Sequence, residues 1–143
     1  MKGAKLGFVA VPAAWLLLVT AAPHAAQSQS VNDGVYTEAQ ATRGEESYNK
    51  DCSSCHGAGL AGDGFAPALA GIEFLSNWNG TSAGDLLDRI RISMPPSSPG
   101  SISTQSKADI IAFMLKFNKY PAGSTELAGS TEALKTIAIE LPK

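Results

Sequence analysis

Cysteine, histidine and methionine are scarce in this sequence, and their scarcity limits the kinds of site it can build. The 143 residues include two cysteines, two histidines and three methionines. A structural zinc site takes about four cysteine or histidine ligands, and one histidine, His24, lies in an N-terminal segment that we expect to be removed. No Ser-His-Asp set, phosphate-binding glycine loop or pair of catalytic carboxylates can be assembled from the rest. The sequence therefore argues against a structural zinc site and against these catalytic machineries.

Basic residues are also in the minority. The full chain has 11 Lys and Arg against 13 Asp and Glu, and loss of Lys2 and Lys5 with the N-terminal segment leaves nine against thirteen, a net charge of −4. Such a charge argues against nucleic acid as a partner and favours proteins with a basic docking face. The chain is long enough for one small domain with a real core and too short for two.

The N-terminus carries the longest apolar run. Lys2 and Lys5 precede this run, which covers residues 6–22, and small and polar residues follow it. This order is typical of a secretory signal peptide, which we place at residues 1–26. The run is long enough to remain as a membrane anchor in the alternative case, since about 17 residues can span a bilayer. We therefore expect export to the periplasm, with membrane attachment only if this segment is retained.

Cysteine and histidine come together in the pentapeptide Cys52-Ser53-Ser54-Cys55-His56. This spacing is that of a c-type haem attachment site, in which one helical turn brings both thiols to one edge of a porphyrin and the histidine points at the iron. The alternatives for a C-x-x-C pair are a thioredoxin-like motif, half of a zinc site or a disulfide. A thioredoxin-like motif normally follows a strand in a βαβ unit, and the sequence has no such pattern. We predict one haem c, attached covalently through Cys52 and Cys55, with His56 as an iron ligand.

The sixth iron ligand is sought among the methionines, because no second histidine remains once His24 is removed. Met94 is followed by two prolines, which end the preceding helix and present the side chain from a stiff loop. Met114 lies in an apolar helical stretch, where a methionine is more often part of the core. We therefore predict His56 and Met94 as the two metal ligands.

Caps and apolar spacing predict three helices and an all-α fold. The first begins at about residue 37 and ends before Cys52, the second covers 82–92 and the third covers 104–119. Five glycines interrupt residues 57–71, which we expect to form a loop. The predicted division of the chain is a signal peptide at 1–26, a flexible leader at 27–36, a haem domain at 37–121 and a C-terminal tail at 122–143 that is packed on the domain or mobile.

Together these motifs resemble the class I cytochrome c family. The matching features are Gly44 and Tyr48 in the first helix, the Cys-x-x-Cys-His sequence, Pro67 eleven residues after His56, Met94 before a proline, and the helical stretch 108–113. The resemblance covers residues 37–121. It implies a small cytochrome c fold in which the N- and C-terminal helices cross around one covalently bound haem.

The resemblance also implies roles for single residues. In that family a glycine of the first helix allows close crossing against an aromatic residue of the last helix, which here places Gly44 against Phe113. The family proline accepts a hydrogen bond from the proximal histidine, so Pro67 is predicted to orient His56. Trp78 is predicted to reach a haem propionate through its indole N–H, and its alternative is a half-buried core residue.

These features predict a carrier of single electrons and not an enzyme. Its partners would be redox proteins, namely a donor dehydrogenase and an acceptor oxidase or reductase. Residues 74–94 are similar to haem domains that accompany bacterial quinoprotein dehydrogenases. One alternative is a haem-bearing relay subunit of a dehydrogenase complex. Another is a haem sensor or peroxidase-like protein with an open sixth position, which requires that Met94 does not bind the iron.

Overall fold

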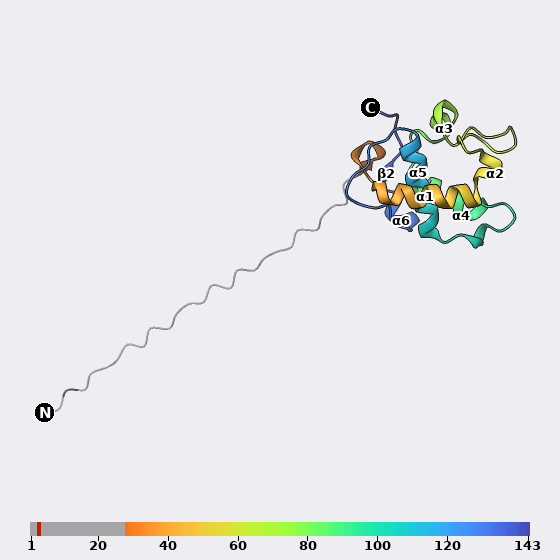
Figure 1. Cartoon of the computed structure of the whole chain (residues 1–143). Coiled ribbons are helices and arrows are strands. Elements are labelled where there is room, and N and C mark those ends of the chain that lie inside the picture. The colour runs from red at the N-terminus through yellow and green to blue at the C-terminus, as the bar shows by residue number, and fades with distance from the viewer. Residues whose placement is uncertain (1–2, 4–27) are drawn as a thin grey trace.

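The computed structural model describes Gly3 and residues 28–143, so the predicted signal peptide lies, apart from Gly3, outside the described residues. The described chain folds into helices with one two-stranded sheet, which confirms the all-α prediction (Figure 1). None of the described helices is long and apolar enough to cross a membrane. In chain order the elements are β1 (Gln29–Ser30), the 3-10 helix η1 (Val31–Asp33), α1 (Glu38–Asp51), α2 (Ser53–His56), α3 (Gly71–Trp78), α4 (Ala83–Ser93), the 3-10 helix η2 (Pro99–Ser101), α5 (Thr104–Phe117), α6 (Thr131–Leu134) and β2 (Ile137–Ala138).

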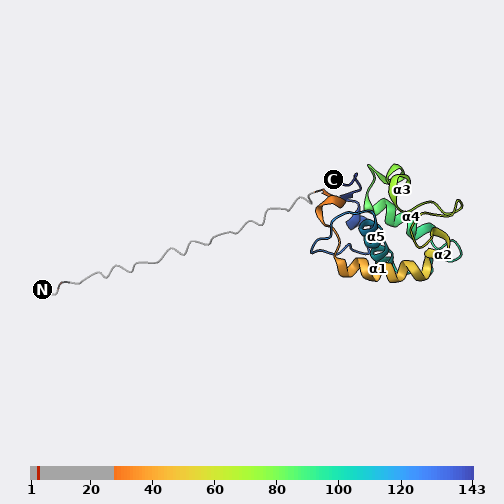
Figure 2. The ribbon, with the colours of Figure 1, turned by 45° about the horizontal axis from the view of Figure 1, so that its top comes forward.

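Helices α1 and α5 pack directly against each other (Figure 2). A Cβ atom on Gly44 would lie 1.8 Å from the carbonyl oxygen of Asp109 on α5, so only glycine permits this approach. The predicted close crossing at Gly44 is therefore confirmed, but its partner differs. The nearest atoms belong to Asp109 and Ile110, whereas Phe113, one turn further on, packs against Tyr48 with ring centroids 5.3 Å apart.

Side-chain caps confirm three predicted helix starts. Thr37 caps α1, and Ser82 and Asp85 form a reciprocal capping box at the start of α4. Ser103 caps α5. A cap of this kind accepts a hydrogen bond from an N–H group that has no partner within the helix. All three signals are local, which explains why the sequence alone contains them.

Helix α3 is not indicated by the sequence. It begins at Gly71, whose φ is +73°, and the preceding Ala70 has no side chain that could cap it. The N–H of Gly71 instead donates to the amide oxygen of Asn118, 2.9 Å away and 47 residues further along the chain. A cap supplied from so far away leaves no local signal, so the sequence gives no prediction of this helix.

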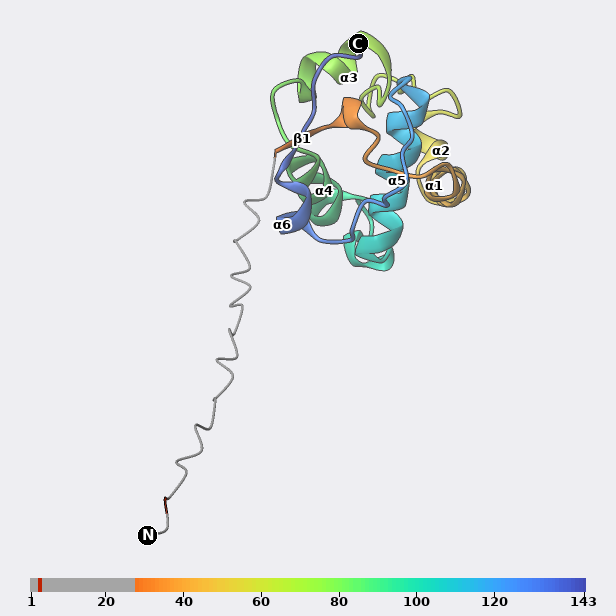
Figure 3. The same cartoon turned by 90° about the vertical axis from the view of Figure 1, so that its left-hand side faces the viewer.

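Residues 28–36 of the predicted flexible leader are in fact ordered and packed on the domain, which corrects that prediction (Figure 3). Strand β1 pairs in parallel with β2 near the C-terminus. Val31, Val35 and Tyr36 are buried, and the Tyr36 hydroxyl donates to the carbonyl of Tyr120 at 2.8 Å. Their neighbours in the sequence are mostly polar residues and a glycine. This composition is typical of a flexible segment, so the sequence does not indicate that the three side chains are buried.

The C-terminal tail at 122–143 is packed on the domain, which was the first of its two expected states. Its buried side chains are Leu127, Leu134, Ile137 and Ile139. These four residues join the same core cluster as α1, α4 and α5. The tail thus completes the hydrophobic core of the haem domain.

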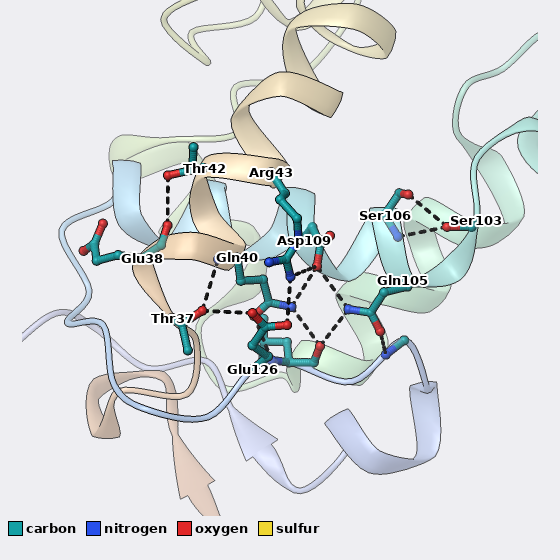
Figure 4. Close-up of polar contacts among 12 residues, drawn as sticks. Thr37, Glu38, Gln40, Thr42, Arg43, Ser103, Gln105, Ser106, Asp109 and Glu126 are labelled. Carbon is teal, nitrogen blue, oxygen red and sulfur yellow. Dashed lines mark hydrogen bonds and ion pairs between the residues drawn. The ribbon is translucent and has the colours of Figure 1, made fainter.

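A polar network ties the tail to α1 and α5 (Figure 4). The Gln40 amide donates to the carbonyl of Leu127 and accepts from its N–H, both at 2.8 Å. It also donates to the buried carboxylate of Asp109 at 2.9 Å, and Arg43 forms an ion pair with that carboxylate at 3.2 Å. Gln105 donates to the same Leu127 carbonyl at 3.1 Å. Every polar group at this junction is thereby bonded, as buried polar groups must be.

Candidate functional site

The Cys-x-x-Cys-His segment lies at the end of α1. The N–H of Cys52 donates to the carbonyl of Tyr48 at 2.9 Å, which closes the last turn of α1. The carbonyl of Cys52 then accepts from the N–H groups of Cys55 at 3.2 Å and of His56 at 3.0 Å. The two thiols are therefore separated by a single helical turn. Both are free, with Cys55 exposed and Cys52 partly buried.

The state of Cys52 bears on the alternatives for this motif. Burial, and to a smaller extent the charge of Asp51, raise the pKa of the Cys52 thiol to about 11. Cys52 is therefore protonated at neutral pH. A thioredoxin-like centre depends on a cysteine with a lowered pKa, and Cys52 does not meet that requirement.

The imidazole of His56 is held in one orientation. It is only 8 % exposed, and its Nδ1 lies 2.9 Å from the carbonyl oxygen of Pro67. Because a carbonyl only accepts, Nδ1 carries the proton, and in the neutral ring Nε2 then keeps its lone pair. The backbone that leads out of His56 is fixed as well. The Tyr48 hydroxyl donates to the carbonyl of Gly57 at 2.6 Å, and the Gly62 N–H donates to the carbonyl of His56 at 2.9 Å.

A turn with its own hydrogen bonds presents the Pro67 carbonyl. The Asp63 carboxylate accepts from the N–H groups of Ala66 at 2.8 Å and Phe65 at 3.0 Å. These two bonds hold the pKa of Asp63 below its usual range. Gly62 has φ +72°, and a Cβ there would lie 2.3 Å from the carbonyl oxygen of Ala66. The glycine-rich loop is thus a defined turn at this point.

The two remaining methionines lie in different surroundings. Met94 is the C-terminal cap of α4, with extended backbone (φ −127°, ψ 139°) and a half-buried side chain. Its N–H donates to the carbonyl of Ile90 at 2.9 Å. Met114 is 1 % exposed and belongs to the core face of α5. Met94 therefore starts a loop, and Met114 is enclosed by the core.

Trp78 is the last residue of α3, is half-buried and packs against the core cluster. Its carbonyl accepts from both the N–H and the hydroxyl of Thr81, at 3.0 Å and 2.7 Å. The half-buried position agrees with the core alternative, and the contact with a haem propionate stays a prediction.

The segments that carry these residues gather at one end of the molecule. Helix α2, the loop 57–70 and the segment after α4 lie together there, away from the C-terminus (Figures 1 and 2). This end brings the two cysteines, His56 and the segment that follows α4 to one side of the domain. It does so from three separate parts of the chain.

Two residues that hold the backbone at this end, Asp63 and Lys107, belong to none of the motifs found in the sequence. Asp63 builds the turn before Pro67, and its place between two glycines is a turn signal that could have been noticed. Lys107, which is 2 % exposed on α5, donates to the carbonyl of Pro99 in the segment after Met94. Nothing in the sequence indicates that second contact, because the two residues belong to different elements.

The donors of this segment fit a covalently bound haem. Two free thiols lie one turn apart, and the imidazole beside them is left with a free Nε2. Among the described residues, no group of three or more His, Cys, Asp or Glu side chains could hold a metal ion. A single fixed imidazole suits a metal that brings its own equatorial ligands, as the iron of a porphyrin does.

Comparison with known proteins gives one match. The sequence model of the family described as "Cytochrome C oxidase, cbb3-type, subunit III" matches residues 39–114. No curated protein and no solved structure matched the chain. The matched region begins in α1 and ends in α5, so it contains Cys52, Cys55, His56, Pro67, Trp78 and Met94.

Proposed function

Because the chain belongs to the c-type cytochrome family described as Cytochrome C oxidase, cbb3-type, subunit III, we propose that it carries single electrons between redox proteins through one haem c. A cytochrome c domain implies haem-based electron transfer. The axial ligands, the covalent linkage, the location and the partners are our proposal. We assign covalent attachment to Cys52 and Cys55 and the axial positions to His56 and Met94.

The observation that carries this proposal is the hydrogen bond between His56 Nδ1 and the Pro67 carbonyl. It fixes the tautomer in which Nε2 is the donor atom, and it makes that nitrogen more basic toward a metal. The bond also restricts the His56 side chain before any metal binds, so binding costs less conformational entropy. His56 is thus prepared as a ligand by contacts that need no metal to form.

The cysteines supply the anchor in this proposal. Each thiol would hold the porphyrin through one vinyl group, as a thioether. The thiol hydrogen would end on the other vinyl carbon, so the linkage needs neither oxidant nor reductant. The thiols lie on one turn of α2, immediately before the ligand His56. One short helix therefore holds both the anchor and the ligand.

When bound, the haem iron takes up and releases one electron between its ferric and ferrous states. The Met94 thioether is a soft donor, and methionine ligation raises the reduction potential relative to a second imidazole. With both axial positions held by side chains, the coordination changes little on electron transfer. A closed site of this kind serves a carrier better than a sensor or a peroxidase-like enzyme.

We propose that the mature protein acts in the periplasm after loss of residues 1–26. Its net charge of −4 without that segment favours donor and acceptor proteins with basic docking faces. A second candidate is a relay subunit of a larger complex, and the name of the matched family, that of an oxidase subunit, favours it. Co-purification of the exported protein with a partner, or migration as a monomer, discriminates these two forms.

The proposal is tested on the exported protein by haem staining after denaturing electrophoresis and by a redox titration. We expect haem that stays with the denatured chain, at one per chain, and a titration that follows a single one-electron step. Replacing both cysteines, Cys52→Ser with Cys55→Ser, abolishes the stain. The exposed Ser54→Ala change in the same turn is the matched control and leaves it unchanged. A wild-type protein without covalently retained haem contradicts the proposal.

A further inference from the structure

We propose that Lys107 is a positioning residue that ties the Met94 loop to helix α5. By the Met94 loop we mean residues 94–103, between α4 and α5. The inference rests on the proposed ligation of iron by Met94. It deepens that proposal by naming what keeps the ligand in place.

The Met94 loop has few hydrogen bonds of its own. Three of its residues are prolines, at 95, 96 and 99, and they have no N–H to donate. The bonds within it run from the Ser98 N–H to the carbonyl of Pro95 and from the Ser101 N–H to the carbonyl of Ser98, each at 3.0 Å. None of the η2 residues is buried. The loop therefore depends on a contact from outside to fix its conformation.

Lys107 supplies such a contact. Its side chain is 2 % exposed, and its Nζ donates to the carbonyl of Pro99 at 2.5 Å. Burying an ammonium group is costly unless it finds a partner. Burial, with a smaller contribution from the charge of Arg91, lowers the pKa of Lys107. The ammonium group of Lys107 is thus buried at a cost in free energy, and the bond to the Pro99 carbonyl offsets part of that cost.

Helix α5 is a suitable anchor because it lies in the core. Its residues 107–115 are buried, and it crosses α1 at the closest backbone approach, that of Asp109 to Gly44. The Met94 side of the loop is already held, since the N–H of Met94 donates to Ile90 in α4. Lys107 holds the loop again at Pro99. The loop is therefore fastened to packed helices at its start and near its middle, which restricts how far Met94 can move from its position.

A looser loop would let an external ligand replace Met94 more readily. We expect Lys107→Met, which keeps the apolar stem and removes the donor, to lower the imidazole concentration that half-displaces Met94 in the ferric protein about tenfold, since hydrogen bonds from charged groups are worth roughly this factor or more. The readout is loss of the charge-transfer band between methionine sulfur and ferric iron. Lys116→Met is the matched control, because Lys116 is an exposed lysine of the same helix that pairs with Glu38.

Two further measurements distinguish the positioning of Met94 by Lys107 from a general effect of Lys107 on stability. Leu134→Ala lowers overall stability through a buried residue of α6 that belongs neither to the Met94 loop nor to its contact with Lys107. We expect it to leave the imidazole concentration that half-displaces Met94 unchanged. Hydrogen exchange at the Ser98 and Ser101 amides should accelerate in Lys107→Met and not in Lys116→Met. If Lys107→Met does not fold, Lys107→Gln, whose amide ends one bond short of the lysine nitrogen, serves with the same expectations.

The outcomes distinguish the two proposals. Equal imidazole concentrations and equal exchange rates in Lys107→Met and Lys116→Met overturn the positioning role, provided that the band is present in the wild type and absent from Met94→Ala. A wild type without the band, or a Met94→Ala protein that keeps it, overturns the ligation on which the inference depends.

Discussion

His56 owes its orientation to several small contacts made by its neighbours. The Pro67 carbonyl accepts a hydrogen bond from Nδ1, and the turn at Asp63 places that carbonyl. Tyr48 and Gly62 hold the backbone that leads out of His56. Each bond is modest alone, about 1 kcal/mol in net stability. Together they leave a single nitrogen free, which is what a metal ligand requires.

The turn at Asp63 gives a pH-dependent prediction. A carboxyl group with a lowered pKa in the folded state stabilises that state above its ordinary pKa of about 3.9, and the stabilisation is lost as the pH falls through the lowered value. We expect the amides of Phe65 and Ala66, corrected for intrinsic exchange, to lose protection at that lowered midpoint. NMR titration of the Asp63 carboxyl measures the midpoint independently.

Asp63→Asn serves as the control, because asparagine keeps an acceptor oxygen and cannot ionise. We expect weaker protection of the same two amides at neutral pH and no change on acidification. A wild-type midpoint at or above the ordinary aspartate value contradicts this description of the turn.

The crossing of α1 and α5 depends on a single missing side chain. A Cβ on Gly44 would lie 1.8 Å from the Asp109 carbonyl oxygen, so an alanine must push the helices apart. We expect Gly44→Ala to lower the free energy of unfolding by roughly 3 kcal/mol, at the upper end of the usual cost of overpacking. Gly59→Ala is the control, because a Cβ there meets nothing within 4 Å. Urea denaturation of both variants decides the point, and equal stabilities would contradict the account.

The elements differ in how much of them the sequence could predict. The starts of α1, α4 and α5 are predictable because Thr37, Ser82 and Ser103 each accept from an N–H group three residues further along the chain. Helix α3 is not, because Asn118 caps it from across the fold. The same distinction holds within the site. The two thiols and His56 follow from local spacing, whereas the contact of Lys107 with the Met94 loop does not.

The N-terminal and C-terminal segments of the described chain pack against each other. Strand β1 pairs with β2 over more than a hundred residues of separation, and Gly123 packs directly against Gly34. Pairing at such distance has no pattern in either segment alone. From the sequence alone, residues 27–36 are therefore predicted to be a flexible leader, and the tail either to pack on the domain or to be mobile.

The tail lies beyond the matched family region, which ends at residue 114, yet we expect it to be essential to stability. Ending the chain at residue 121 removes four buried leucine and isoleucine side chains. Each contributes about 1.5 to 3 kcal/mol on burial, offset in part by the entropy of ordering the tail, so we expect a loss on the order of 5 kcal/mol. Removing only the exposed Pro142 and Lys143 should leave stability nearly unchanged. Thermal unfolding of both truncated proteins tests this, and equal midpoints would contradict the tail's role in the core.

The central claim is a six-coordinate haem held by His56 and Met94. The most direct test is the absorption spectrum of the ferric protein, recorded for the wild type, Met94→Ala and Met114→Ala, in the far-red region where methionine sulfur bound to ferric iron gives a weak band. We predict the band in the wild type and in Met114→Ala, whose methionine lies in the core, and its loss in Met94→Ala alone. A wild type that lacks the band and binds carbon monoxide readily in its ferrous form would contradict the claim and point to an open site.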